Sequence, residues 1–123
     1  MRKKIKIDSN SKFVPEISNI NDSLYYFSYE ISIQNKSGKK VKLLSRHWNI
    51  INGFGDNKQI DGEGVIGKKP IINPGEVFKY SSYCPLSTQY GTMNGFYTMK
   101  DESGEIFKVI IPKFSLYQPE VIN

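Results

Sequence analysis

The sequence predicts an all-β sandwich of about seven strands, Ig-like or fibronectin type III-like in arrangement. Short stretches alternate between apolar and polar residues with a period of two, and turn residues separate them. Aromatic residues, which favour strands, make up 13% of the 123 residues. No stretch shows the period of an amphipathic helix. The length predicts a single domain over residues 1–123, with residues 118–123 as a loose tail.

The clearest strand runs from Leu24 to Gln34. One face of it is apolar, and polar side chains alternate on the other face. We expect the apolar face in the core: Tyr25, Phe27, Tyr29, Ile31 and Ile33. Upstream, residues 2–8 predict an edge strand with lysines on its open side. Pro15 breaks residues 9–22, where a second short strand is expected before a turn.

The next strand is expected over residues 41–51 and changes phase within its length. Val41 and Leu43 share one parity, whereas Leu44, Trp48 and Ile50 share the other. This change predicts a β-bulge at Leu43–Leu44. Trp48 is expected to be a core anchor whose indole N–H needs an acceptor.

Two connections are predicted from turn residues. Residues 35–39 resemble a hairpin loop in which Gly38 supplies a positive φ. After a strand over residues 76–82, Cys84–Gly91 is expected to be a long connection that opens with a Cys84–Pro85 turn.

Two strands are expected near the C-terminus. Over residues 92–100, one face carries Met93, Tyr97 and Met99, and Gly95 on the same face allows a close approach of neighbouring backbone. Residues 106–111 are β-branched, and Pro112 is expected to end that strand or to place it at an edge.

The charge pattern argues against sequence-specific nucleic-acid binding. The net charge is +5, but lysine supplies nearly all of it and only Arg2 and Arg46 are arginine. Arginine makes most bidentate contacts with bases, so the lysines are expected on a solvated face. Cys84 is the one cysteine, which fits a reducing compartment. Neither a signal-peptide pattern nor a long apolar run is present, so we expect a cytoplasmic protein without a membrane partner.

The titratable residues indicate neither an enzyme nor a metal site. His47 and Cys84 are each the one residue of their type, and the carboxylates are scattered. Ser45 shares a face with His47 but lacks an orienting acid, so Arg46 and His47 are expected to make structural hydrogen bonds. We expect no catalytic residue, no metal ligand and no cofactor.

The one motif with a functional alternative is a G-x-G-x-x-G formed by Gly62, Gly64 and Gly67. A dinucleotide site needs a helix after such glycines, and the prolines that follow forbid one. Two interpretations stay open. The loop amides with Lys68 and Lys69 form an anion-binding nest for a nucleotide polyphosphate, or the glycines supply turns and bulges between the sheets.

Several motifs in order resemble the bacterial ApaG (CorD) family over roughly residues 5–116: LLSRHW at 43–48, GEGVIG at 62–67, NPGE at 73–76, GTMNGFY at 91–97 and IPKFSL at 111–116. Tyr83 and Gln89–Tyr90 depart from the family pattern. The resemblance implies an Ig-like or fibronectin type III-like fold and a link to cobalt resistance and magnesium efflux. It also implies a protein-interaction role, because similar eukaryotic domains are appended to larger proteins.

Two functional hypotheses follow from the residues and the resemblance. The first is a non-enzymatic interaction module that binds an unidentified partner protein. The second is a small-molecule sensor that binds pyrophosphate or a dinucleoside polyphosphate at Gly62, Gly64, Gly67, Lys68 and Lys69. The sequence predicts neither the partner nor the oligomeric state.

Overall fold

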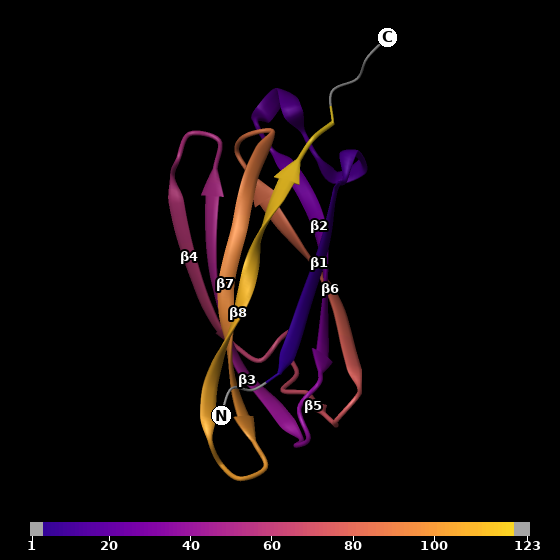
Figure 1. The fold of residues 1–123 in the computed structure, drawn as a ribbon. Helices are drawn as coiled ribbons and strands as arrows, with labels where there is room; N and C mark the ends of the chain where they lie inside the picture. The colour runs from indigo at the N-terminus through magenta and orange to yellow at the C-terminus, as the bar shows by residue number, and fades with distance from the viewer. Residues whose placement is uncertain (1–3, 120–123) are drawn as a thin grey trace.

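The computed structural model describes residues 4–119 (Figure 1). Over these residues the chain forms eight strands and two single-turn 3₁₀ helices, η1 (Pro15–Ile17) and η2 (Ile20–Asp22). The strands are β1 (Ile5–Phe13), β2 (Tyr25–Asn35), β3 (Val41–Asn52), β4 (Asn57–Glu63), β5 (Ile71–Ile72), β6 (Val77–Leu86), β7 (Tyr90–Asp101) and β8 (Ile106–Tyr117). No helix within this part of the chain is long and apolar enough to cross a membrane.

The strands form two antiparallel sheets that pack face to face. One sheet has the order β1-β2-β6, and the other has the order β4-β3-β7-β8, with the short β5 also paired to β3. This arrangement confirms the predicted all-β sandwich. Period-two alternation produces it directly, because each strand places every second side chain between the sheets.

The predicted core residues meet between the two sheets. Phe27, Ile31 and Ile33 of β2 are fully buried, and Tyr97 of β7 faces them from the other sheet. Trp48 is 2% exposed, and the edge of its ring packs against Tyr29 at a centroid distance of 5.6 Å. Its indole N–H has no acceptor among residues 4–119, contrary to the expectation that burial brings a partner.

Both predicted irregularities of the larger sheet are present. The register between β3 and β7 shifts at Leu43–Ser45, which confirms the bulge. At Gly95 a Cβ atom would lie 1.9 Å from the backbone oxygen of His47. The sheet therefore requires glycine there, as a close backbone approach predicts.

The predicted hairpin at residues 35–39 is wrong. This segment carries the chain from β2 in one sheet to β3 in the other, and Gly38 does not have a positive φ. The buried side chain of Asn35 shapes the crossing instead. Its amide donates to the backbone oxygens of Lys39 at 2.8 Å and Ile72 at 2.9 Å. These side-chain hydrogen bonds fix the crossing where a hairpin turn was expected.

The predicted connection at Cys84–Gly91 is also wrong. β6 continues through Pro85 to Leu86, because Cys84 and Leu86 keep the apolar alternation and are buried. β6 is the edge strand of its sheet, where a missing proline N–H costs no ladder hydrogen bond. Pro112 is likewise accommodated inside β8, at the edge of the larger sheet.

The ends of the chain differ from expectation where they are described. β1 extends to Phe13, and η1 and η2 replace the short strand expected in residues 9–22. The Gln118 N–H donates to the Gln89 oxygen at 2.9 Å. The first residue of the expected loose tail is therefore hydrogen-bonded to the rest of the chain. Residues 1–3 and 120–123 lie outside the described part of the chain.

The two sides of the sandwich are closed to different degrees. On one side β1 packs along β8, and the Ser11 hydroxyl donates to the Ser115 oxygen at 2.6 Å. On the other side, the edge strands β4 and β6 line a cleft that runs between the sheets. We call these the closed side and the open side.

Candidate functional site

The glycine-rich loop is a tight turn at one end of β4. The Val65 N–H donates to the Lys68 oxygen at 2.8 Å, and the Lys68 N–H donates back to the Val65 oxygen at 2.9 Å. Between them Ile66 has a φ of 44° and Gly67 a φ of 77°. Two consecutive positive φ values are what a type I′ turn requires; Gly67 adopts its value at little cost, whereas the β-branched Ile66 is strained there.

Gly64 is required by a neighbouring backbone atom, whereas Gly62 leaves room for the Arg46 side chain. The Arg46 guanidinium lies over Gly62, where a Cβ atom would be 2.6 Å from it. Arg46 Nη1 also donates to the oxygens of Glu63 at 3.0 Å and Gly64 at 2.9 Å. Gly64 has a φ of 60°, and a Cβ atom there would lie 2.0 Å from the Lys68 oxygen. The conformation of the turn therefore explains Gly64 and Gly67, and Gly62 accommodates the Arg46 guanidinium.

The two lysines of the loop have different surroundings. Lys69 Nζ lies 2.6 Å from a Glu63 carboxylate oxygen, and this hydrogen bond and charge lower the pKa of Glu63. Lys68 has no ion pair within residues 4–119. The Gly64 N–H donates to the Leu44 oxygen at 2.8 Å. The loop amides of Gly64, Val65 and Lys68 are therefore already used inside the protein.

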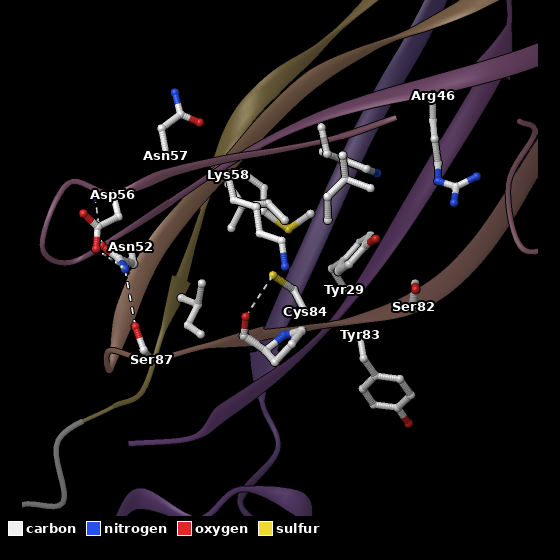
Figure 2. Close-up of a pocket in the computed structure, with 16 residues that line it drawn as sticks. Tyr29, Arg46, Asn52, Asp56, Asn57, Lys58, Ser82, Tyr83, Cys84 and Ser87 are labelled. Carbon is white, nitrogen blue, oxygen red and sulfur yellow. Dashed lines mark hydrogen bonds between the residues drawn. The ribbon is translucent and has the colours of Figure 1, made fainter. Parts of the chain in front are cut away.

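A cleft with a volume of about 440 Å³ lies on the open side (Figure 2). Its apolar lining comes from both sheets: Trp48, Ile50, Ile60, Pro85, Leu86 and Met93. The cleft runs lengthwise between two polar ends. Arg46 and Ser82 lie near one end, and Asn52, Asp56 and Ser87 lie near the other.

Lys58 of β4 crosses the middle of this cleft. Figure 2 shows its ammonium directed toward Cys84 on β6. Burial is the largest influence on the Cys84 thiol and raises its pKa to about 11, against a smaller opposing effect of the Lys58 charge. Burial likewise raises the pKa of Tyr29, and its hydrogen bond to Ser82 opposes the rise. At neutral pH the cleft therefore presents a neutral thiol, a neutral phenol and the cation of Lys58.

At the Asp56 end of the cleft, the polar side chains form hydrogen bonds with one another and with the nearby backbone. The Asn52 side-chain amide donates to Asp56 Oδ2 at 3.3 Å and to the Ser87 hydroxyl at 3.4 Å. The Asn52 side-chain oxygen accepts from the N–H groups of Phe54 at 2.9 Å and Asp56 at 3.0 Å. Asn52 thus fixes the turn between β3 and β4 and holds the Asp56 carboxylate at the end of the cleft away from Arg46.

His47 lies on the outer face of the larger sheet, away from the cleft. Its Nδ1 is 2.6 Å from Asp61 Oδ1, and its ring stacks on Phe96 at a centroid distance of 4.9 Å. The neighbouring strand supplies an acid that the sequence around His47 did not reveal, because Asp61 is the register partner of His47. Within residues 4–119, no three His, Cys, Asp or Glu side chains converge as metal ligands.

The same outer face carries exposed apolar side chains on β8. Ile110 is 68% exposed and is the register partner of Phe96, and Ile106 is 62% exposed and pairs with Lys100. The Lys108 ammonium lies 4.4 Å from the centre of the Phe96 ring. We call this group, Phe96, Lys100, Ile106, Lys108 and Ile110, the β7–β8 face.

Sequence reasoning brought together the loop residues but missed the cleft and the β7–β8 face. The structure places Gly64, Gly67, Lys68 and Lys69 in or beside one turn and Gly62 in the last part of β4, as their adjacency implies. The cleft joins Lys58 to Cys84 across two sheets that no local pattern connects. For the β7–β8 face a signal was present, since Ile106 and Ile110 have the parity opposite to that of the buried Ile111.

Comparison with known proteins gives one consistent family. Residues 15–101 match the model of the ApaG domain. Protein ApaG of Methylobacterium sp. (strain 4-46) is 46% identical over 117 residues, covering 95% of this chain and 90% of that protein. Protein ApaG of Beijerinckia indica subsp. indica is 40% identical over 122 residues, covering 97% and 94%. The crystal structure of the putative ApaA protein from Bordetella pertussis superposes with a TM-score of 0.93, at 36% identity and 97% coverage of both chains.

Proposed function

Because the chain belongs to the ApaG domain family, we propose that it is a non-catalytic interaction module that binds a partner protein in the cytoplasm. Any effect of the protein on cobalt resistance or magnesium efflux then passes through that partner. The unpaired Cys84 fits the reducing conditions of that compartment.

The observation that carries this proposal is the β7–β8 face. Isolated exposed apolar residues are ordinary, but here Ile110 and Phe96 are neighbours across two strands, and Ile106 lies on the same face of β8 beyond Lys108. Lys108 lies between the two isoleucines and Lys100 pairs with Ile106, so positive charge lies among the apolar side chains. Apolar centres with charged surroundings are typical of protein interfaces, so this face suits a partner with an apolar patch ringed by acidic residues.

The reactive side chains support a non-catalytic role. The Cys84 thiol is buried, and its raised pKa keeps it in the weakly nucleophilic protonated form at neutral pH. His47 and Asp61 are paired on an open sheet face, whereas acid–base catalysis depends on a site that holds a substrate within hydrogen-bond reach. The stacking of His47 on Phe96 gives this pair a structural role at the edge of the proposed interface.

A second candidate function is the binding of a nucleotide polyphosphate at the glycine-rich loop. The N–H groups of Ile66 and Gly67 donate to no backbone oxygen within residues 4–119, and Lys68 beside them is unpaired there. Two adjacent amides and a lysine are a small anion-binding nest. Because Lys69 is engaged by Glu63, we expect only weak, salt-sensitive affinity.

An affinity pull-down from the native cell tests the first candidate. The wild type is compared with the double variant Ile106→Ser, Ile110→Ser, and Ile71→Ser is the matched control because Ile71 is 59% exposed elsewhere. We expect a partner that the wild type and the control enrich and that the double variant loses. Equal recovery by all three proteins contradicts the β7–β8 face as the interface.

A backbone amide NMR titration with a dinucleoside polyphosphate at low salt tests the second candidate. Saturable shifts confined to residues 62–69 support it, and Gly64→Val should abolish them by blocking the conformation of the turn. No shifts at millimolar ligand exclude the loop as a polyphosphate site and leave the interaction module.

A further inference from the structure

The cleft on the open side has the size and lining of a small-molecule site. Its volume of about 440 Å³ lies within the range of roughly 300–1,000 Å³ usual for such sites. The walls are mostly apolar, with Trp48 and Ile50 on β3 and Leu86 on β6. Such walls favour a flat apolar group and lower the local dielectric, which strengthens any charge interaction inside.

The charges in the cleft point to the sign of its ligand. Lys58 and Arg46 both line it, and neither forms an ion pair with a carboxylate in the part of the chain that the structure describes. Arg46 Nη1 donates to two backbone oxygens. Because these oxygens carry no net charge, they do not compensate the positive charge of the guanidinium. The one acidic residue in the lining, Asp56, lies at the far end with Asn52. An anionic group would therefore be attracted to the Arg46 end.

The edges of the cleft argue against an added peptide strand as its occupant. Pro85 removes a donor from β6, and Lys58 projects inward from β4. Proline and inward-pointing charge are two devices by which edge strands avoid pairing with another chain. A compact ligand needs no strand pairing and is compatible with both.

We infer that this cleft binds a small organic anion, with a carboxylate or phosphate group between Lys58 and Arg46 and an apolar body against the half-buried Ile50 and Ile60. This site is separate from the glycine-rich loop and from the β7–β8 face, and it does not depend on the proposed partner. Lys58 makes the ionic contact from a flexible side chain, and Ile50 and Ile60 form the wall on which the apolar body rests.

Trp48 is the natural reporter, because it lies buried in the cleft lining beside Ile50 and is the one tryptophan in the chain. Its indole N–H gives a single resolved signal in a ¹H–¹⁵N NMR spectrum. Three probes share one apolar body and differ in the head group: 2-naphthoate, 2-naphthyl phosphate and the neutral 2-naphthol. We expect saturable shifts of the Trp48 signal, with at least one anion binding about tenfold more tightly than 2-naphthol. Whichever anion binds more tightly identifies the head group that the site prefers.

Lys58→Gln removes the charge while keeping most of the side-chain length. We expect it to weaken binding of the preferred anion about tenfold and to leave 2-naphthol unchanged. Lys79→Gln is the matched control, because Lys79 is an exposed lysine on β6 outside the cleft lining. It should bind both probes as the wild type does.

Three results would overturn the inference. One is the absence of a saturable Trp48 shift with either anion at millimolar concentration. Another is equal weakening by Lys58→Gln and Lys79→Gln, which would indicate a general charge effect. The third is anion shifts confined to residues 62–69. If Lys58→Gln perturbs the fold, the test rests on the wild type alone. Anions that bind no more tightly than 2-naphthol would then overturn the inference.

Discussion

The edge strands of the two sheets are arranged differently on the two sides of the sandwich. On the closed side, β1 packs along β8 and a hydrogen bond from Ser11 to Ser115 ties the two sheets together. On the open side, β4 and β6 stay apart and line a cleft that holds Lys58. The closed side contributes contacts and the open side leaves a cavity. The difference separates the part of the fold that stabilises from the part that can recognise a ligand.

The largest expected effect falls on the core that both sides share. Phe27 is fully buried, so Phe27→Ala should lower the free energy of unfolding by roughly 3–5 kcal/mol. Phe54 is 80% exposed at the turn beside the open side, and Phe54→Ala should change it by less than about 0.5 kcal/mol. Urea denaturation measures both. A loss below about 1 kcal/mol for Phe27→Ala would contradict its place in the core.

A smaller loss is expected at the glycine-rich turn, which ends the open side. Gly64→Val places a side chain at a φ of 60° and against the Lys68 oxygen, and should cost roughly 2–3 kcal/mol. Gly38→Val is the control, because Gly38 has open space around it and no positive φ. Thermal or urea unfolding of the two variants checks this. Equal stability would show that the turn opens freely, as an anion nest would require.

The pH dependence of the free energy of unfolding tests whether water is excluded from Cys84 in the cleft on the open side. Because burial raises the Cys84 pKa to about 11 from its reference value of 9.0, the protonated thiol favours the folded state. This contribution is complete below pH 9 and is lost as the pH rises toward 11. Between pH 8 and pH 10 the free energy of unfolding should fall by about 1 kcal/mol.

Cys84→Ala provides the control for the pH experiment. It removes the thiol, so the variant should show a smaller decrease between pH 8 and pH 10 than the wild type. The buried tyrosines contribute to both proteins alike, since burial also raises the pKa of Tyr29, Tyr80 and Tyr97. Parallel curves for the two proteins would mean that water reaches Cys84 in the cleft.

What the sequence predicted was local. The alternation in β2, the bulge at Leu43 and the close approach at Gly95 each follow from a few adjacent residues, and the structure has all three. The errors concern partners distant in the sequence. Residues 35–39 have the composition of a hairpin, but whether two strands pair or cross to another sheet depends on the whole core.

The candidate sites show the same division. The glycines were compatible with both a turn and an anion nest, because both need positive φ. A contact that engages a loop amide inside the protein, from the Gly64 N–H to the Leu44 oxygen, comes from another strand. Asp61 opposite His47 and Lys58 opposite Cys84 also arise from register and sheet packing. The alternation of apolar and polar residues does not predict either of these two residue pairs.

One paired measurement tests the contrast between the two sides most directly. Urea unfolding and the titration of the Trp48 indole signal with the preferred naphthyl anion are performed on Ser11→Ala and Lys58→Gln. We expect Ser11→Ala to lose about 0.5–1 kcal/mol of stability, since it removes one hydrogen bond, and to bind the anion like the wild type. Lys58→Gln should keep its stability and bind about tenfold more weakly. If each variant changes stability and binding together, the closed and open sides do not divide these roles, and the account is wrong.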